Sequence, residues 1–383
     1  MRFLDFVLHN VLRRKVRSML TGIGVALAMA AVVALLGVAG GFERSFMEVY
    51  QRRGVDLMVV RAGVSERLAS SIHERFTERL LALPGVDKVS PSLNDTVTTE
   101  GGNAMGLPLR GWRPDSFAFD GLRIKKGRKL TAADHDGVLL GTALATNLKK
   151  DVGDTTEFET HPFKVVGIYE SDNVFENGAA LVLLDSLQQL MDRGEQVTEF
   201  QVALKPDLPD KKVAIDKLKR DIENLRDEEG KRVGLAALSS EEFVRGNFEI
   251  RMARAMAWVT STIALVIGAI GMLNTMIMSV LERTQEIGVL RAIGWRRWSV
   301  VRMILTEALL LSMGGTLLGT LSAVGLIRFL SQFPATQGFL RGDVSLDVIL
   351  TGFVLSLGMA LVGGAYPALR GANLSPIEAL RYE

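Results

Sequence analysis

Few residues in this sequence have the type and spacing that enzymatic chemistry requires. The chain has no cysteine, which excludes disulfide bonds, thiolate metal sites and cysteine nucleophiles. His135 lies between Asp134 and Asp136, but no second histidine or carboxylate cluster lies nearby in the sequence at a ligand-like spacing. We therefore expect a loop at this position and no metal site.

Nucleotide and nucleic-acid chemistry find no support either. The phosphate-binding pattern Gly-x-x-x-x-Gly-Lys-Ser/Thr is absent, and Gly121–Gly127 with Lys125 and Lys126 has the wrong spacing for it. The 45 Lys+Arg residues nearly balance the 43 Asp+Glu residues, so a nucleic-acid-binding surface is not indicated. We predict a chain without catalytic residues that binds no cofactor directly.

One short segment, residues 282–294, combines charged and apolar side chains at helical spacing. On a helix they separate into two groups: Glu282, Arg283 and Glu286 on one side, and Ile287, Leu290 and Ile293 on another. Such a helix can dock onto a soluble partner. Gly288 and Gly294 would let a partner's backbone come close or let the chain bend. An ordinary charged connector is the alternative interpretation.

The elements that must position this segment follow from the distribution of charge. Four stretches carry no charged residue: Met19–Gly41, Ala255–Leu281, Ala308–Ile327 and Val348–Leu369. Each reaches the ~20 residues that a transmembrane helix needs, and none has the polar stripe of a buried helix in a soluble protein. We predict transmembrane helices over 19–41, 255–281, 306–327 and 348–369. The first of these exceeds the h-region of a cleaved signal peptide, so we expect a retained anchor.

Basic residues in the short flanking segments predict the orientation. Residues 1–18 and 282–305 hold five Lys or Arg residues each, whereas the loop 328–347 holds only Arg328 and Arg341. Because basic residues favour the cytoplasmic side, we expect both termini, the segment 282–305 and the tail 370–383 to be cytoplasmic. Residues 42–254 and the loop 328–347 would then be extracytoplasmic.

The large region 42–254 has the pattern of a mixed α/β domain. Strands are predicted at Val55–Arg61, Val86–Ser90, Phe200–Leu204 and Val233–Leu238, with helices at Ser65–Leu83 and Pro209–Leu225. These make two βαβ units, interrupted by a β-rich insert at about 95–195 with runs such as Gly137–Leu140, Thr155–Glu159 and Lys164–Tyr169. The predicted fold class is an α+β membrane protein with four transmembrane helices and a large mixed α/β domain between the first two.

Helical spacing continues beyond the membrane on both sides of this domain. The residues that carry it are Phe42, Phe46 and Val49 after the first span, and Val244, Phe248 and Met252 before the second. Gly54 is a natural stop for the first helix, and Ser239-Ser240-Glu241-Glu242 is a capping box before the second. At 1.5 Å per residue each extension would rise ~20 Å above the bilayer. We expect a two-helix stalk; helices of the domain core are the alternative.

Three segments resemble the MacB/FtsX family of ABC transporter permeases, the type VII group. The segment after the second span reads Glu-Arg-x-x-Glu-Ile-Gly-x-x-Arg-Ala-x-Gly, from Glu282 through Arg291 and Ala292 to Gly294, and is similar to the family's coupling segment. Residues 9–24 resemble the amphipathic elbow that leads into the family's first span, so we expect such an elbow at 1–18 in this chain. Residues 366–381 resemble the family's closing tail. The order of one span, an external domain and three spans is also that of the family.

The resemblance implies a permease that pairs with a second copy or a paralogue and with cytoplasmic ABC ATPase subunits in a bacterial plasma (inner) membrane. ATP and Mg²⁺ would be bound by the partner ATPase, and Glu282–Gly294 would dock into it. Since only 18 residues precede the first span, we expect no fused ATPase. Implied further partners are membrane lipids and a periplasmic adaptor or lipoprotein, and the implied cargo is a lipid, lipoprotein, peptide or drug.

Two other functions stay open at the level of sequence. An FtsX-like regulatory scaffold would activate an extracytoplasmic cell-wall enzyme in place of moving cargo. An ion-coupled secondary transporter is disfavoured by four spans without a visible inverted repeat. Glu307, near the inner end of the third span, is costly unless paired, and we expect an ion pair with Arg302 or contact with headgroup water. Gly37-x-x-x-Gly41 and Gly315-x-x-x-Gly319 predict close helix packing.

Overall fold

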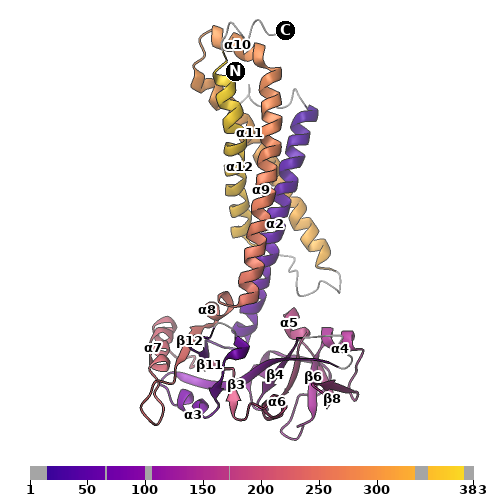
Figure 1. Ribbon diagram of the computed structural model, residues 1–383, viewed down its shortest axis with the longest axis vertical. Coiled ribbons are helices and arrows are strands. Elements are labelled where there is room, and N and C mark those ends of the chain that lie inside the picture. Colours follow the sequence, from indigo (N-terminus) through magenta and orange to yellow (C-terminus); the bar gives the residue numbers. More distant parts are fainter. Residues whose placement is uncertain (1–14, 65–66, 100–105, 172, 333–343, 375–383) are drawn as a thin grey trace. The chain divides into compact units, whose positions relative to one another are not determined.

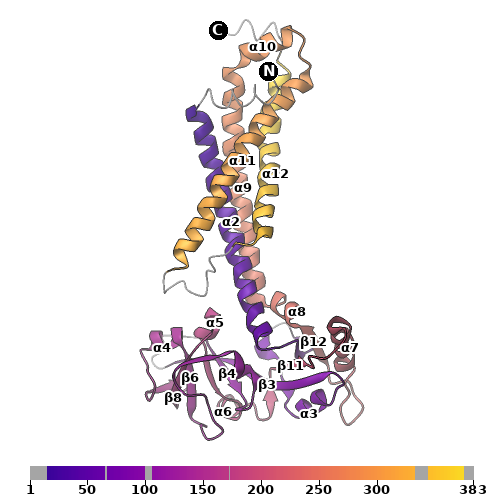
Figure 2. The same ribbon diagram turned by 180° about the vertical axis from the view of Figure 1, so that it is seen from behind.

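The computed structural model describes residues 15–64, 67–99, 106–171, 173–332 and 344–374. The chain divides into two compact units, one of residues 43–251 and one of the remaining residues on both sides. Figure 1 labels the elements along the chain, and Figure 2 gives the same ribbon from behind. Most of the predicted elbow 1–18, loop 328–347 and tail 370–383 lies outside the described residues.

Four long helices are the framework of the helical unit. They are α2 (Lys15–Arg52), α9 (Phe248–Glu282), α11 (Arg297–Leu330) and α12 (Leu346–Ala372). All four are long and apolar enough to cross a membrane, and each predicted span lies inside one of them. With a sheet domain between α2 and α9, the predicted fold class is confirmed (Figure 1).

Small residues allow these helices to pack closely. A Cβ atom on Gly319 of α11 would lie 2.4 Å from the carbonyl oxygen of Ala26 on α2, and one on Gly315 would lie 2.7 Å from Cγ1 of Val25. Only a hydrogen atom fits there, so the backbones of α2 and α11 are in direct contact, as the Gly315-x-x-x-Gly319 spacing predicts. The Ser312 hydroxyl donates to the carbonyl oxygen of Ser356 at 2.9 Å and joins α11 to α12.

The sheet unit, residues 43–251, is built on ten strands in the order β12-β1-β11-β3-β4-β9-β6-β8-β5, with β7 paired to β8. The strands are β1 (Leu57–Arg61), β3 (Val86–Val97), β4 (Leu107–Trp112), β5 (Arg123–Gly127), β6 (Gly137–Gly141), β7 (Thr155–Phe158), β8 (His161–Glu170), β9 (Ala180–Leu183), β11 (Glu199–Leu204) and β12 (Leu235–Ser239). The helices are α3 (Phe76–Leu81), α4 (Thr142–Leu148), α5 (Val174–Asn177), α6 (Leu184–Leu190), α7 (Lys211–Glu223) and α8 (Ser240–Arg245).

The two predicted β-α-β units interleave in one half of the sheet. β1 and β3 flank α3 in sequence, yet β11 lies between them and pairs antiparallel with both. β11 and β12 flank α7, and β1 lies between them in the same way. Each unit is therefore a split β-α-β unit whose parallel strands are separated by a strand of the other. Asp210 caps α7 by accepting hydrogen bonds from the amides of Lys212 and Val213.

The predicted insert does not form a separate sheet. Its strands continue the main sheet because the long β3 pairs with β4, and β4 pairs with β9. The largest apolar cluster extends under both halves, from Ile222 and Leu57 to Val138 and Phe163. The insert also carries the helices α4, α5 and α6. The insert is thus rich in strands, and these strands extend the main sheet and contribute to the core that the two halves share.

The predicted helix Ser65–Leu83 is wrong over most of its length. Within its described residues, 67–83, only α3 is α-helical, and it is preceded by the short strand β2 (Ile72–His73) and the 3₁₀ turn Arg67–Ala69. β2 pairs with β10 (Gln196–Val197), and the Ser70 hydroxyl donates to the carbonyl oxygen of Thr198 at 2.6 Å. These bonds to a segment more than a hundred residues away override the local helical spacing.

Candidate functional site

The predicted coupling segment forms a short helix between two long ones. α9 ends at Glu282, α10 (Thr284–Ala292) follows, and α11 begins at Arg297 after an extended residue. Arg283 separates α9 from α10 with φ −108° and ψ 15°. Gly294 has φ +101°, a conformation that glycine adopts without steric cost, and it turns the chain toward α11.

The inner face of α10 is part of the helical unit. Ile287 is 1% exposed and belongs to an apolar cluster with Val280 of α9, Ile304 of α11 and Ala372 of α12. Leu290 packs against the same cluster while staying half-exposed. Because α10 contributes to a core that three long helices share, it cannot move far without disturbing all three.

A buried ion pair reinforces this anchoring. Arg283 Nη1 lies 3.1 Å from Glu307 Oε2 on α11, and Arg283 Nε lies 3.1 Å from Glu286 Oε2 on α10. The side chains of Arg283 and Glu307 are 7% and 10% exposed. We expected Glu307 to pair with Arg302 or to contact headgroup water. The structure instead shows an ion pair with Arg283, which lies 24 positions away in the sequence. Removing one partner of such a pair costs about 3–5 kcal/mol because the other charge stays buried.

A second ion pair joins the start of α2 to this site. Arg17 on α2 pairs with Glu282, the last residue of α9. Both views place α10 at the end of the helical unit where the described part of α2 begins (Figures 1 and 2). Movement of α10 would thus reach α2 through Glu282 as well as α11 through Glu307.

The outer face of α10 is exposed and mixes apolar and charged side chains. Val289 and Ile293 are 48% and 70% exposed, and Trp298 at the start of α11 is 71% exposed. Glu286 lies beside them with a side chain that is 48% exposed. Exposed aromatic and aliphatic residues rimmed by charge are typical of a protein–protein contact surface.

Comparison with known proteins identifies the chain's family. Residues 18–225 match the family profile described as the MacB-like periplasmic core domain, and residues 258–376 match the FtsX-like permease C-terminal profile. The chain belongs to the MacB/FtsX family of ABC transporter permeases. It is accordingly a multi-pass membrane protein with a periplasmic domain, of a family that works with ABC ATPase subunits.

Individual relatives extend over nearly the whole chain. The macrolide export ATP-binding/permease protein MacB of Campylobacter jejuni is 26% identical over 98% of this chain, which spans 60% of that relative's length. The uncharacterized ABC transporter permease YvrN of Bacillus subtilis is 27% identical, and the match covers 98% of each chain. A crystal structure of the periplasmic region of MacB from Actinobacillus actinomycetemcomitans is 19% identical with a TM-score of 0.39, covering 52% of this chain and 96% of that one.

In this MacB/FtsX permease, the nine residues predicted for ATPase coupling fall into three groups. Arg283, Ile287 and Gly288 are buried, Leu290 and Arg291 are half-buried, and Glu282, Glu286, Ala292 and Gly294 are exposed. The exposed residues are the ones most accessible to a partner, and the structure adds Val289 and Ile293 to them. Ile293 leaves the predicted apolar side because α10 ends one residue earlier and the chain turns there.

The predicted stalk residues are also divided. α2 continues unbroken to Arg52, with Val49 buried and with Phe42 and Phe46 half-buried. On the other side Gly246 and Asn247 interrupt the helix, so that Val244 lies in α8 and is buried. The Asn247 side chain accepts a hydrogen bond from the amide of Glu249 at 2.9 Å and starts α9 anew.

The prediction of one continuous helical stripe through Val244, Phe248 and Met252 is therefore wrong. Phe248 and Met252 are 68% and 44% exposed, and the buried residue at the start of α9 is Ile250. In the segment that precedes α9, the contacts with α2 are made by α8. There the rings of Tyr50 and Phe243 meet edge to face with centroids 5.7 Å apart, and Arg245 Nε lies 3.3 Å from Glu43 Oε1.

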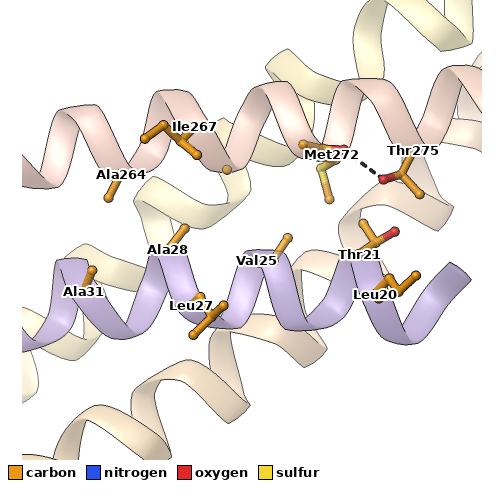
Figure 3. A pocket seen from close by; sticks show the side chains of 13 residues that line it. Leu20, Thr21, Val25, Leu27, Ala28, Ala31, Ala264, Ile267, Met272 and Thr275 are labelled. Carbon is orange, nitrogen blue, oxygen red and sulfur yellow. Dashed lines mark hydrogen bonds between the residues drawn. The ribbon is translucent and has the colours of Figure 1, made fainter. Parts of the chain in front are cut away.

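An apolar groove of about 420 Å³ lies between α2 and α9 (Figure 3). Leu20, Val25 and Leu27 of α2 and Ile267 and Met272 of α9 line it together with small residues of both helices. The Thr275 hydroxyl donates to the carbonyl oxygen of Gly271 and is satisfied within α9. Cβ atoms added at Gly24 or Gly271 would meet nothing within 4 Å, so both backbones stay accessible. Small residues of this kind permit close approach of a further helix.

Metal binding finds no support in the part of the chain that the structure describes, where no group of three or more His, Asp or Glu residues could hold an ion. Asp134 accepts hydrogen bonds from Arg128, which lower the pKa of that carboxyl group below its ordinary value. His161 Nε2 lies 3.1 Å from Asp136 Oδ1, a contact that sequence spacing missed because the residues are 25 positions apart.

Proposed function

We propose that this permease transmits the ATP-driven motion of a separate ATPase subunit to its periplasmic domain, for export of a substrate or its extraction from the membrane. The substrate classes that we consider are a lipid, lipoprotein, peptide or drug. Two permease chains and two ATPase subunits would assemble. Because the glycine-lined groove between α2 and α9 can admit another helix, it suits a second permease copy.

The observation that carries this proposal is the two-sided character of α10. Its outer face exposes Glu286, Val289 and Ile293, whereas its inner side is held by Ile287 and by the Arg283–Glu307 ion pair. A helix of this kind can receive a push from a soluble partner and pass it into α9, α11 and α12 together. A connector that only joined two spans would not need a buried salt bridge.

Export is favoured over a regulatory scaffold by the relatives. The MacB proteins that match over nearly the whole chain are named macrolide export ATP-binding/permease proteins. For this chain to act as the permease part of such an exporter, an ATPase would have to bind on the side of α10. A cell-wall enzyme bound by the periplasmic domain would instead favour the FtsX-like scaffold.

The docking of α10 is tested by variants of its outer face. The double variant Glu286→Lys/Val289→Asp reverses one exposed charge and makes one exposed apolar residue acidic, so we expect co-purification of the cognate ATPase to fall at least tenfold. Glu223→Lys, at an exposed glutamate of α7, makes a matched charge change far along the chain and should leave co-purification unaltered. Undiminished ATPase binding by the double variant would contradict the assignment of this surface.

Transmission is tested separately by Arg283→Met. This variant keeps the outer face but removes the buried link to Glu307, so we expect the ATPase to stay bound while stimulation of its hydrolysis by the permease is lost. The companion Arg283→Met/Glu307→Leu removes the unpaired charge as well and distinguishes lost coupling from misfolding. If both variants stimulate hydrolysis like the parent, the ion pair has no part in coupling.

A further inference from the structure

Helix α12 contains a proline inside its length. Pro367 is buried and lies before the last helical residue, Ala372. A proline has no amide hydrogen, and its ring crowds the carbonyl group four residues earlier, which here belongs to Gly363. Side chains of the described residues donate to the α12 carbonyl oxygens of Phe353 and Ser356 but not to that of Gly363. The helical ladder of hydrogen bonds is therefore interrupted at this level of α12.

The interruption lies between two apolar clusters of the helical unit. Met359 of α12 packs with Met29 of α2 in one of them. Ala368 packs with Ile287 of α10 in the other. None of the described residues 361–367 belongs to either cluster. Side-chain packing thus holds α12 on both sides of Pro367 but not across it.

Two glycines bring the backbone of α12 against two other helices at the same level. A Cβ atom added to Gly363 would lie 3.0 Å from the carbonyl oxygen of Ala269 on α9. One added to Gly364 would lie 3.0 Å from the Cβ atom of Ala308 on α11. Backbone atoms cannot yield as flexible side chains do, so these contacts form a fixed point about which the rest of α12 can turn.

Beyond Pro367, the end of α12 lies directly against the coupling segment. A Cβ atom added to Gly371 would lie 3.8 Å from Cδ1 of Ile287 on α10 and 3.0 Å from Cδ1 of Ile304 on α11. Interiors packed this closely transmit displacement rather than absorb it. A displacement of α10 therefore presses on the end of α12 first.

Close packing alone explains the glycines but not the proline. Inside a helix a proline costs about 3 kcal/mol relative to alanine, and sharp bends in helices occur mostly at prolines. At Pro367 this cost falls between the two clusters and leaves the packing of each one intact. It lowers the stiffness of α12 only where bending would separate no packed side chains.

We propose that α12 bends at a joint, residues 363–367, when α10 moves. The short arm, residues 368–372, follows α10, while the long arm, residues 346–362, stays packed on α2 and α9. The joint thereby turns a displacement of α10 into a change of angle between the two arms. Its part in coupling rests on the proposed function, but the bending itself does not and is measurable without an ATPase.

The first test uses the full chain in detergent, without an ATPase. Because the chain has no cysteine, spin labels can be attached at Gln285→Cys on α10 and Val354→Cys on the long arm, which replace exposed residues. We expect a broad distance distribution with Pro367 present and a narrower one in Pro367→Ala, which restores the missing donor. The pair Ile263→Cys/Val354→Cys, on the long-arm side of the joint, should be narrow in both. Equal distributions for the first pair with and without Pro367 overturn the proposal, whatever an ATPase does.

The second test connects the bend with the ATPase. Pro367→Ala should still co-purify with the cognate ATPase but lose the stimulation of its hydrolysis. Pro367→Gly leaves a larger gap than alanine but keeps the joint pliable, so it should stimulate more than Pro367→Ala does. The reverse order would show lost packing in place of lost bending and would overturn the proposal.

A matched control lies on the long arm. A Cβ atom at the exposed Gly358 would meet nothing within 4 Å, so Gly358→Ala stiffens α12 away from the joint and should stimulate like the parent. Loss of stimulation in Gly358→Ala as well would contradict the placement of the joint. If the parent chain itself stimulates no ATPase, the proposed function fails, and the label distances still decide whether α12 bends.

Discussion

Glu176 of α5 is held by two arginines that are far from it in the sequence. Arg53 Nη2 lies 2.8 Å from Glu176 Oε2, and Arg110 Nη1 lies 2.9 Å from Glu176 Oε1. The guanidinium group of Arg53 also stacks on the ring of Trp112 at 5.1 Å, and its side chain is 1% exposed. Because Arg53 directly follows α2, this cluster fixes the end of the first long helix to the insert of the sheet unit.

The pKa of Glu176 makes this cluster sensitive to acid. Burial alone would raise that pKa, but the charges of Arg53 and Arg110 outweigh it and lower the pKa below its ordinary value of 4.5. A carboxylate with a lowered folded-state pKa contributes stability that is present above its unfolded pKa and lost as pH falls through the folded one. Glu176→Gln should therefore destabilise the sheet unit by about 3–5 kcal/mol at pH 7, because Arg53 stays buried without its counter-charge.

The pH dependence separates this effect from a simple packing defect. The difference between parent and Glu176→Gln should begin to shrink as pH falls below about 4.5, where the carboxyl group of the unfolded chain becomes protonated, and should vanish once pH has passed the lower folded-state pKa, where the folded parent loses the same charge. Hydrogen exchange of peptides from β4 and α5, measured across pH in the full chain, reports it locally. Glu229→Gln, at an exposed glutamate, should show no such trend. A destabilisation that is equal at every pH would argue against the electrostatic explanation.

No signal in the sequence pointed to these pairs. Arg53 and Glu176 are 123 positions apart, and Arg283 and Glu307 are 24 apart in different helices. Spacing rules relate residues only within one helix or strand, so they predicted an ion pair between Glu307 and the nearby Arg302. The exposed part of the candidate site, Glu282 and Glu286, was predictable because charge beside a membrane span indicates a solvent-facing end.

Helices whose local sequence determines their structure were predicted, whereas segments whose structure depends on contacts with distant parts of the chain were not. The four long helices follow from uncharged stretches, and α7 follows from its cap at Asp210 and its apolar stripe. The segment Ser65–Leu83 failed because Ile72 serves strand β2, whose partner β10 lies beyond the insert. The break at Asn247 was missed since helical spacing continues across it by coincidence.

Contact between α2 and α11 gives a prediction at the scale of elements. In Gly319→Ala the new Cβ would lie 2.4 Å from a backbone oxygen of α2, which cannot yield as a flexible side chain would. The overpacking cost of about 1–3 kcal/mol should exceed the gain of up to ~1 kcal/mol from better helix propensity. We expect a lower thermal midpoint for the purified permease in detergent.

The matched control lies on the same helix. A Cβ at Gly325 of α11 would meet nothing within 4 Å, so Gly325→Ala gains helix propensity without a clash and should leave the midpoint unchanged or raise it slightly. Equal midpoints for Gly319→Ala and Gly325→Ala would mean that α2 and α11 do not touch at this position.

At the scale of the whole molecule, orientation in the membrane decides which surface meets which partner. The proposed function requires α10 in the cytoplasm, where an ATPase can reach it, and the sheet unit on the opposite side. Family membership gives a periplasmic domain, and the positive-inside rule gives the same sidedness from the basic residues of 1–18 and 282–305. The two arguments are independent, since one compares sequences and the other depends on charge.

Because the chain has no cysteine, single introduced thiols report this orientation cleanly. Gln285→Cys on α10, Lys212→Cys on α7 and Gln332→Cys after α11 all replace exposed residues of the described chain. In spheroplasts that lack the partner ATPase, a membrane-impermeant maleimide should label the thiols at positions 212 and 332 at once and the thiol at 285 only after permeabilisation. Basic residues resist transfer across the membrane, so the five of the segment 282–305 should hold α10 inside. Labelling of the thiol at 285 in sealed spheroplasts would place α10 outside, where no ATP-driven partner could act on it, and would refute the proposed direction of transmission.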